Sequence, residues 1–334
     1  MVVRISLRSI PEPMTSDQIS YFIFGIIILS ALIFDLGLLS KKDKKVTIRK
    51  ALYQTYFWVG LAIGFFVFVW LKYGQVTGLE YLSAYLMEWS LSIDNIFVFI
   101  LIFSAFGVQE KNYGRVLLLG ILMAIVFRVI FITVGVALVE KFHWILYVFG
   151  VFLVYTGYKM FVSQNEQEFN PQKSKVYTVL NKLLPLVPHD GEGKFYFIEN
   201  GKRVYTTLFV VVIMLAAIDL VFALDSIPAV MGISRDKLVI YTSNIFALLG
   251  LRSLFFLLRG AVTKFDYLQQ GIAIVLVFIG VKMLGEHWIN MWLPKTTQVF
   301  ISLGVIMLCI SGSIFYSIFI QRKGLPEDYD DDSN

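Results

Sequence analysis

The stretch "MEWSLSIDNIFVFILIF", residues 87–103, carries two carboxylates and an amide inside a segment apolar enough to cross a bilayer. These side chains belong to Glu88, Asp94 and Asn95. A charge at the centre of a membrane helix costs on the order of 3 kcal/mol on insertion scales, so buried acids persist where they are paired, hydrated or used. The segment therefore indicates a membrane helix that contributes to a polar site.

The composition is that of a polytopic membrane protein. Of the 334 residues, 57% are hydrophobic and 16% charged, which is too apolar for an ordinary soluble domain. Basic residues gather in cytoplasmic loops for topological reasons, so we read the net charge of +5 as a membrane feature and expect no nucleic acid as partner. Cys309 is the single cysteine, which argues against disulfides, thiolate metal sites and redox chemistry. We expect no prosthetic group.

Nine stretches have about the 20 apolar residues that a membrane helix needs. They lie near 19–39, 51–73, 80–105, 113–139, 143–162, 206–231, 238–259, 267–286 and 296–320. The connection "KKDKKVTIRK" and the loop 163–205 are rich in Lys and Arg, which places both in the cytoplasm. We therefore expect an all-α, multi-pass protein of the inner membrane, with the N-terminus outside and the C-terminus inside.

This count divides the chain into five parts. They are an external tail 1–18, spans one to five in 19–162, a cytoplasmic loop 163–205, spans six to nine in 206–320 and an acidic tail 321–334. Within the loop, "FYFIENGKRVYTT" predicts a small hairpin.

An internal repeat relates spans three to five to spans six to eight. "VFLVYTGYKMF" from residue 151 resembles "IVLVFIGVKML" from residue 274. Upstream, each copy has an acidic pair six residues apart and then an intramembrane arginine: Glu88, Asp94 and Arg128 in the first, Asp219, Asp225 and Arg252 in the second. A unit of three spans enters the membrane from opposite sides in its two copies, so the sequence predicts an inverted repeat with a site near midplane.

Neutral oxygen ligands accompany the acids: Ser90, Ser92 and Asn95 in the first copy, and Ser226 in the second. On a regular helix Glu88, Ser92 and Asn95 share one face, whereas Asp94 points about 120° away. Either each helix loosens at its motif, which Pro228 would assist, or the second acid faces a neighbouring helix. Oxygen ligands suit manganese, calcium or magnesium.

The arginines are the natural partners of any acid that is not bound to a cation. Four acids against Arg128 and Arg252 leave two negative charges, which suits a divalent cation or two protons. We expect the acids to form a transport site and the arginines to be structural. Asp35, near the inner end of the first span, either extends the pathway or is merely hydrated.

Three long segments resemble the signature segments of TerC membrane proteins, particularly the Alx branch. They are "EWSLSIDNIFVFILIF", "DLVFALDSIPAV" and "YTSNIFALLGLRSLFFLLRG", and the resemblance covers nearly the whole chain. It implies a fold like that of LysE-type exporters, a link to tellurite resistance, manganese export and supply of metal to exported enzymes. The paired acids of the family fall on Glu88 and Asp94 with Asn95, and on Asp219 and Asp225 with Ser226. Many members have a glutamate where this chain has Ala216.

The sequence therefore favours a secondary transporter that exports Mn²⁺, driven by proton exchange. A carrier for Ca²⁺ or a broader set of divalent cations stays open. So does a membrane scaffold that docks secretion machinery on the loop 163–205 or supplies it with metal, and so does a homo-oligomer. The Gly-x-Gly-Asp motif of diaspartyl membrane proteases and the Walker motif of nucleotide-driven pumps are both absent, so we expect no enzyme.

Overall fold

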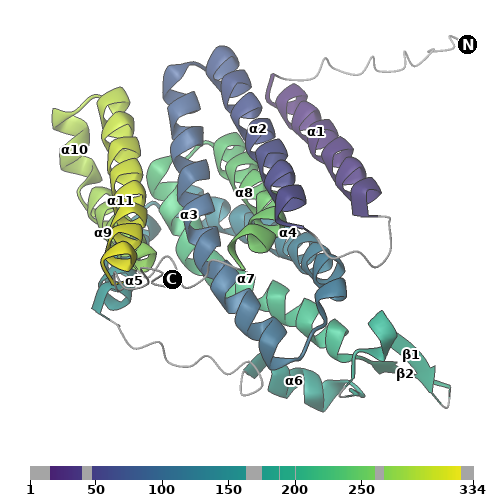
Figure 1. Ribbon diagram of the computed structural model, residues 1–334. Coiled ribbons are helices and arrows are strands. Elements are labelled where there is room, and N and C mark those ends of the chain that lie inside the picture. Colours follow the sequence, from purple (N-terminus) through teal and green to yellow (C-terminus); the bar gives the residue numbers. More distant parts are fainter. Residues whose placement is uncertain are drawn as a thin grey trace, which may run out of the picture. The chain divides into compact units, whose positions relative to one another are not determined.

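The computed structural model describes residues 16–39, 47–162, 175–187, 189–199, 201–259 and 267–324. Within these described ranges, nine long helices lie where the sequence predicts spans (Figure 1). Their bounds are α1 Ser16–Leu39, α2 Ile48–Tyr73, α3 Gln75–Ala105, α4 Glu110–Lys141, α5 Ile145–Val162, α7 Thr207–Ile233, α8 Lys237–Leu258, α9 Leu268–Leu284 and α11 Lys295–Gly324. The predicted helical class is confirmed.

Shorter elements lie between these helices. They are α6 Lys175–Leu183, a 3-10 turn Gly191–Gly193, the strands β1 Tyr196–Glu199 and β2 Lys202–Tyr205, and α10 Glu286–Trp292. The two strands pair antiparallel, so the predicted hairpin is present. Helix α6 is not predicted from the sequence.

Six of the described helices are long and apolar enough to cross a membrane, and the bent pair of α9 and α10 would make a seventh. That pair bends by 79° at its break. The count of nine spans stays a prediction. Contacts divide the chain into two compact units, residues 1–42 with α1 and residues 43–334 with the other elements.

The two predicted repeats pack as antiparallel counterparts within the larger unit. Near the start of α3, Glu80 accepts a hydrogen bond from Ser234, which directly follows α7, so these two helices run in opposite directions. The same holds for α4 and α8, because the end of each contacts the start of the other. The ion pairs that show it are Glu140 with Lys237 at 2.8 Å and Glu110 with Arg259 at 3.8 Å.

Helices of one repeat also pack on helices of the other repeat: α3 packs on α8, and α4 packs on α7. Because α8 is the counterpart of α4 and α7 that of α3, these two contacts are equivalent under the repeat. The third pair, α5 with α9, meets at glycines. A Cβ atom added to Gly280 would lie 2.7 Å from the Gly150 carbonyl oxygen, and one added to Gly157 would lie 2.7 Å from that of Ala273. These two contacts are also equivalent, because Gly157 aligns with Gly280 and Gly150 with Ala273.

We expect Gly280→Ala to destabilise the protein by about 1–3 kcal/mol, because the new methyl group forces the closely packed α5 and α9 apart. Thermal unfolding in detergent measures the change. Gly304→Ala on α11 is the matched control, since its methyl group would meet no atom within 4 Å. Equal stability of the two variants would contradict the close packing.

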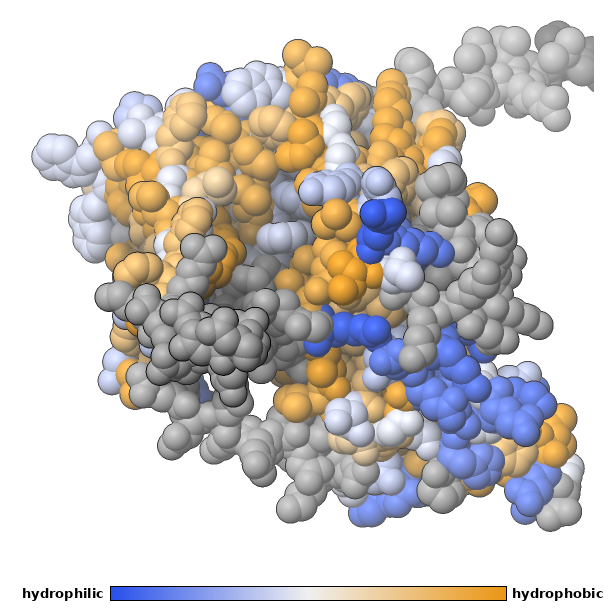
Figure 2. Space-filling model, in the orientation of Figure 1, coloured by the Kyte–Doolittle hydropathy of each residue, from blue (hydrophilic) through white to orange (hydrophobic). Residues whose placement is uncertain are grey.

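One end of the bundle carries the β-hairpin (Figure 1). On the face drawn in Figure 2, hydrophilic residues gather around β1 and β2, and hydrophobic residues cover much of the helices. We call this the hairpin end. The opposite end, with the turns α2–α3 and α7–α8 and with α10, is called the pocket end. Large apolar side chains such as Phe152, Leu308 and Phe315 are exposed along the helices, as in a protein surrounded by lipid.

Candidate functional site

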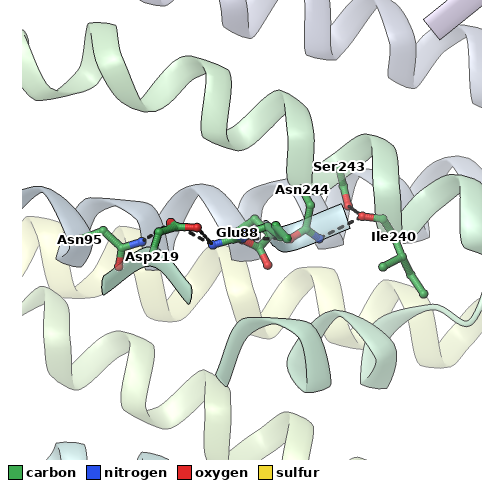
Figure 3. A network of polar contacts seen from close by, with 7 residues as sticks. Glu88, Asn95, Asp219, Ile240, Ser243 and Asn244 are labelled. Atoms are coloured by element: carbon green, nitrogen blue, oxygen red, sulfur yellow. Dashed lines mark hydrogen bonds and ion pairs between the residues drawn. The ribbon is translucent and has the colours of Figure 1, made fainter. Parts of the chain in front are cut away.

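A buried arginine connects the two repeats at the middle of the bundle. Arg128 on α4 donates through Nη1 to Glu88 Oε2 on α3. Its Nη2 lies 3.2 Å from both carboxylate oxygens of Asp219 on α7. All three side chains are at most 2% exposed. Two acids that are 131 residues apart in the chain thus share one guanidinium. Figure 3 shows Glu88 and Asp219 within the surrounding network of polar contacts.

Each acid also lies beside a polar side chain of the other repeat. Asn95 on α3 donates through Nδ2 to Asp219 Oδ1 at 3.5 Å. The Ser226 hydroxyl on α7 lies beside the Glu88 carboxylate. Asn95 and Ser226 each follow their own repeat's acid by seven residues, so these contacts are equivalent under the repeat. The acids therefore lie about a pseudo-two-fold axis between α3 and α7, where inverted-repeat transporters bind their substrates.

Asn244 on α8 also belongs to this site, although it is not among the residues predicted from the sequence. Its Oδ1 accepts from Arg128 Nη1 at 2.9 Å, and its Nδ2 donates to the Ile240 carbonyl oxygen at 2.9 Å (Figure 3). The amide is therefore fixed in the orientation that accepts from the guanidinium. The sequence feature that points to Asn244 is a run of three polar residues, Thr242, Ser243 and Asn244, within an otherwise apolar segment.

Several buried oxygens of the site make no hydrogen bond among the described residues. They are Glu88 Oε1 and the hydroxyls of Ser90, Ser92 and Ser226. Burying a polar atom without a partner is costly. Carboxylate and hydroxyl oxygens are also the ligands that hard divalent cations prefer. Glu88 and Asp219 together match the charge of one such cation, which would compete with Arg128 for the same oxygens.

The structure unites part of the predicted set. Glu88, Asn95, Asp219, Ser226 and Arg128 converge, and Ser92 is buried on α3 but makes no hydrogen bond through its hydroxyl to the described residues. Arg252 is buried on α8. The side chains of Asp35, Asp94 and Asp225 lie outside the described part of the chain. No group of three or more His, Cys, Asp and Glu side chains suited to a metal occurs among the described residues.

The structure decides between the two alternatives for the helix geometry at the motifs. The helices do not break at their motifs, because α3 is continuous over Gln75–Ala105 and α7 is continuous over Thr207–Ile233 with Pro228 inside it. Arg128 pairs with Glu88 and Asp219, as expected of an arginine beside acids that hold no cation, and its structural role stays a prediction.

Comparison with known proteins gives one consistent family. The family model described as integral membrane protein TerC family matches residues 73–325. A membrane protein of Myxococcus xanthus is 41% identical over 303 residues, which cover 91% of this chain and 93% of that protein. Alx of Escherichia coli K12, whose name proposes a membrane-bound redox modulator, is 35% identical over 310 residues, covering 90% and 96%. No solved structure matches the chain.

Proposed function

Because the chain belongs to the TerC family of integral membrane proteins, we propose that it is a secondary transporter for a divalent metal cation, with Mn²⁺ as the leading substrate. The observation that carries this proposal is the buried triad of Glu88, Arg128 and Asp219 between two inverted repeats. Buried ionisable residues inside membrane proteins mark ion pathways, and inverted repeats place such a site where both sides can reach it in turn.

In this mechanism Arg128 acts as an internal substitute for the transported cation. Two buried carboxylates without a counter-charge would be strongly destabilised, and the guanidinium prevents this when no metal is bound. An arriving cation binds the carboxylate oxygens of Glu88 and Asp219, and the Arg128 side chain moves away from them. Asn244 holds one guanidinium nitrogen and so favours its return.

Proton exchange follows from the chemistry of the ligands. A carboxylate must lose its proton before it binds a metal, so metal binding releases protons and acid on the receiving side promotes metal release. Lowering the pH on the loading side therefore weakens uptake, and lowering it on the receiving side speeds discharge. In the predicted topology the loading side is the cytoplasm and the direction is export.

The name of the Alx relatives proposes a redox role, and we do not propose that this chain fulfils such a role by thiol chemistry. With Cys309 as its single cysteine, the chain has no thiol partner for an intrachain disulfide. A transporter of a redox-active metal would influence redox balance without any thiol of its own. This reading is compatible with the relatives' name and needs no catalytic residue.

The test is Mn²⁺ uptake into liposomes of phosphatidylethanolamine and phosphatidylglycerol that contain the purified protein. An acidic lumen should drive saturable uptake, and the lumen should become more alkaline as Mn²⁺ enters. An excess of Ca²⁺ that leaves Mn²⁺ uptake unchanged selects manganese over the broader divalent carrier. Uptake no faster than in protein-free liposomes, for Mn²⁺ and Ca²⁺ alike, would contradict the proposal.

A further inference from the structure

A second polar cluster lies at the pocket end of the bundle, around Glu80 near the start of α3. It surrounds a pocket of about 230 Å³. The charged residues that line the pocket are Glu80, Arg235, Lys282, Glu286 and Lys295, and Ser234, Asn290 and Gln298 add hydroxyl and amide groups. The central site described above includes none of these residues.

Glu80 is the buried acid of this cluster, with 2% of its surface exposed. Ser234 donates its hydroxyl to Glu80 Oε2 at 2.5 Å. The Lys295 ammonium at the start of α11 lies 2.9 Å from Oε1, yet Oε1 makes no hydrogen bond of good geometry. Because the Lys295 side chain is 71% exposed, its ammonium keeps most of its hydration in either position, so a cation that supplies the counter-charge of Glu80 can replace it.

Glu80 is in line with the central site. It precedes Glu88 by eight residues on the same helix, which corresponds to a rise of about 12 Å. Both residues face α7, since Glu80 contacts Ser234 and Glu88 lies beside Ser226. Between these levels α3 and α7 bury apolar residues such as Ala84 and Val230. The two carboxylates are thus separate positions along one helix interface, closed from each other in this structure.

The same charge arrangement occurs at both positions. Glu88 and Asp219 are held by Arg128, and Glu80 is held by Lys295. Each buried acid in the described part of the chain is therefore paired with a basic side chain from another helix. At the pocket the basic residues exceed the acids by one, and Arg235 also pairs with Glu286 at the rim. A divalent cation would bind there weakly, as a release position requires.

We propose that Glu80 is a second binding residue for the transported divalent cation, placed at the exit of the path, and that Lys295 occupies it when no cation is present. This inference rests on the proposed function. The cation leaves Glu88 and Asp219 when the α3–α7 interface opens toward the pocket end, reaches Glu80 by displacing Lys295, and is released past Arg235 and Lys282.

The test counts Mn²⁺ ions bound to the purified protein in detergent, from the loss of the electron paramagnetic resonance signal of aqueous Mn²⁺. We expect Lys295→Gln to bind a second ion with at least roughly tenfold higher affinity than wild type, because the competing ammonium is gone. The double variant Lys295→Gln with Glu80→Gln should lose that ion. Lys295→Gln with Glu286→Gln is the matched control and should keep it, since Glu286 lies at the exposed rim.

Transport gives an independent readout. Glu80→Gln keeps an oxygen that accepts from Ser234, so the variant should fold, and its Mn²⁺ flux should fall by roughly tenfold or more. Wild-type flux in Glu80→Gln, or equal ion counts in Lys295→Gln with and without Glu80, would overturn this inference and leave the central site standing. A wild type that neither binds nor moves Mn²⁺ would overturn the proposed function, and this inference with it.

Discussion

Arg128→Met should lower the free energy of unfolding by about 3–5 kcal/mol in metal-free buffer, because it leaves Glu88 and Asp219 buried together without a counter-charge. Mn²⁺ should then raise the melting temperature of the variant more than that of wild type, since the cation no longer competes with the guanidinium. Thermal unfolding in detergent, with and without 1 mM or so of Mn²⁺, measures both effects.

Two further variants show whether this effect belongs to the site. Adding Glu88→Gln to Arg128→Met removes one of the two uncompensated charges and should recover part of the lost stability. Arg259→Met removes an arginine whose partner, Glu110, is 3.8 Å away and partly exposed, so it should cost less than about 1 kcal/mol. A loss for Arg128→Met as small as that for Arg259→Met would refute the role assigned to Arg128.

Glu88→Gln and Asp219→Asn should each lower the apparent affinity for Mn²⁺ in the liposome assay by roughly 10- to 100-fold, because each removes a charged ligand from a buried site. Both variants keep an oxygen that accepts from Arg128, so folded protein should be recovered. The pseudo-two-fold relation of the two acids predicts losses of similar size.

Glu140→Gln is the control for this pair. It changes the same charge on a membrane helix, but its carboxylate is 58% exposed and pairs with Lys237 at the surface. It should transport at the wild-type rate. Flux that falls equally in Glu140→Gln and Glu88→Gln would mean that net charge, rather than a binding site, controls transport.

Much of the fold could be predicted from the sequence because hydrocarbon thickness fixes the length of each apolar stretch. The predicted span 206–231 corresponds to α7 at Thr207–Ile233, and the predicted span 238–259 to α8 at Lys237–Leu258. The short match around Gly157 and Gly280 was enough to indicate the repeat, and the same two glycines lie in equivalent contacts between α5 and α9. Polar elements such as α6 lack this constraint and were missed.

The site could be predicted only in part because a sequence gives the face of a helix but not its register against a neighbour. Glu88 and Asp219 were recognised as costly buried charges, whereas Asn244 carries no charge and looked like an ordinary residue of an apolar segment. Glu80 falls at the start of the predicted span 80–105, where an acid is normally hydrated. The structure extends α3 back to Gln75 and buries Glu80 against Ser234.

The measurement that tests the central claim most directly is the equilibrium binding of Mn²⁺ to purified wild-type protein and to the double variant Glu88→Gln with Asp219→Asn. Removing both acids eliminates the counter-charges of a divalent cation and leaves Arg128 in place. We predict that the wild type binds Mn²⁺ at the central site and that the double variant, while folded, loses this ion. Equal binding by the two proteins would contradict the claim that these carboxylates hold the transported cation.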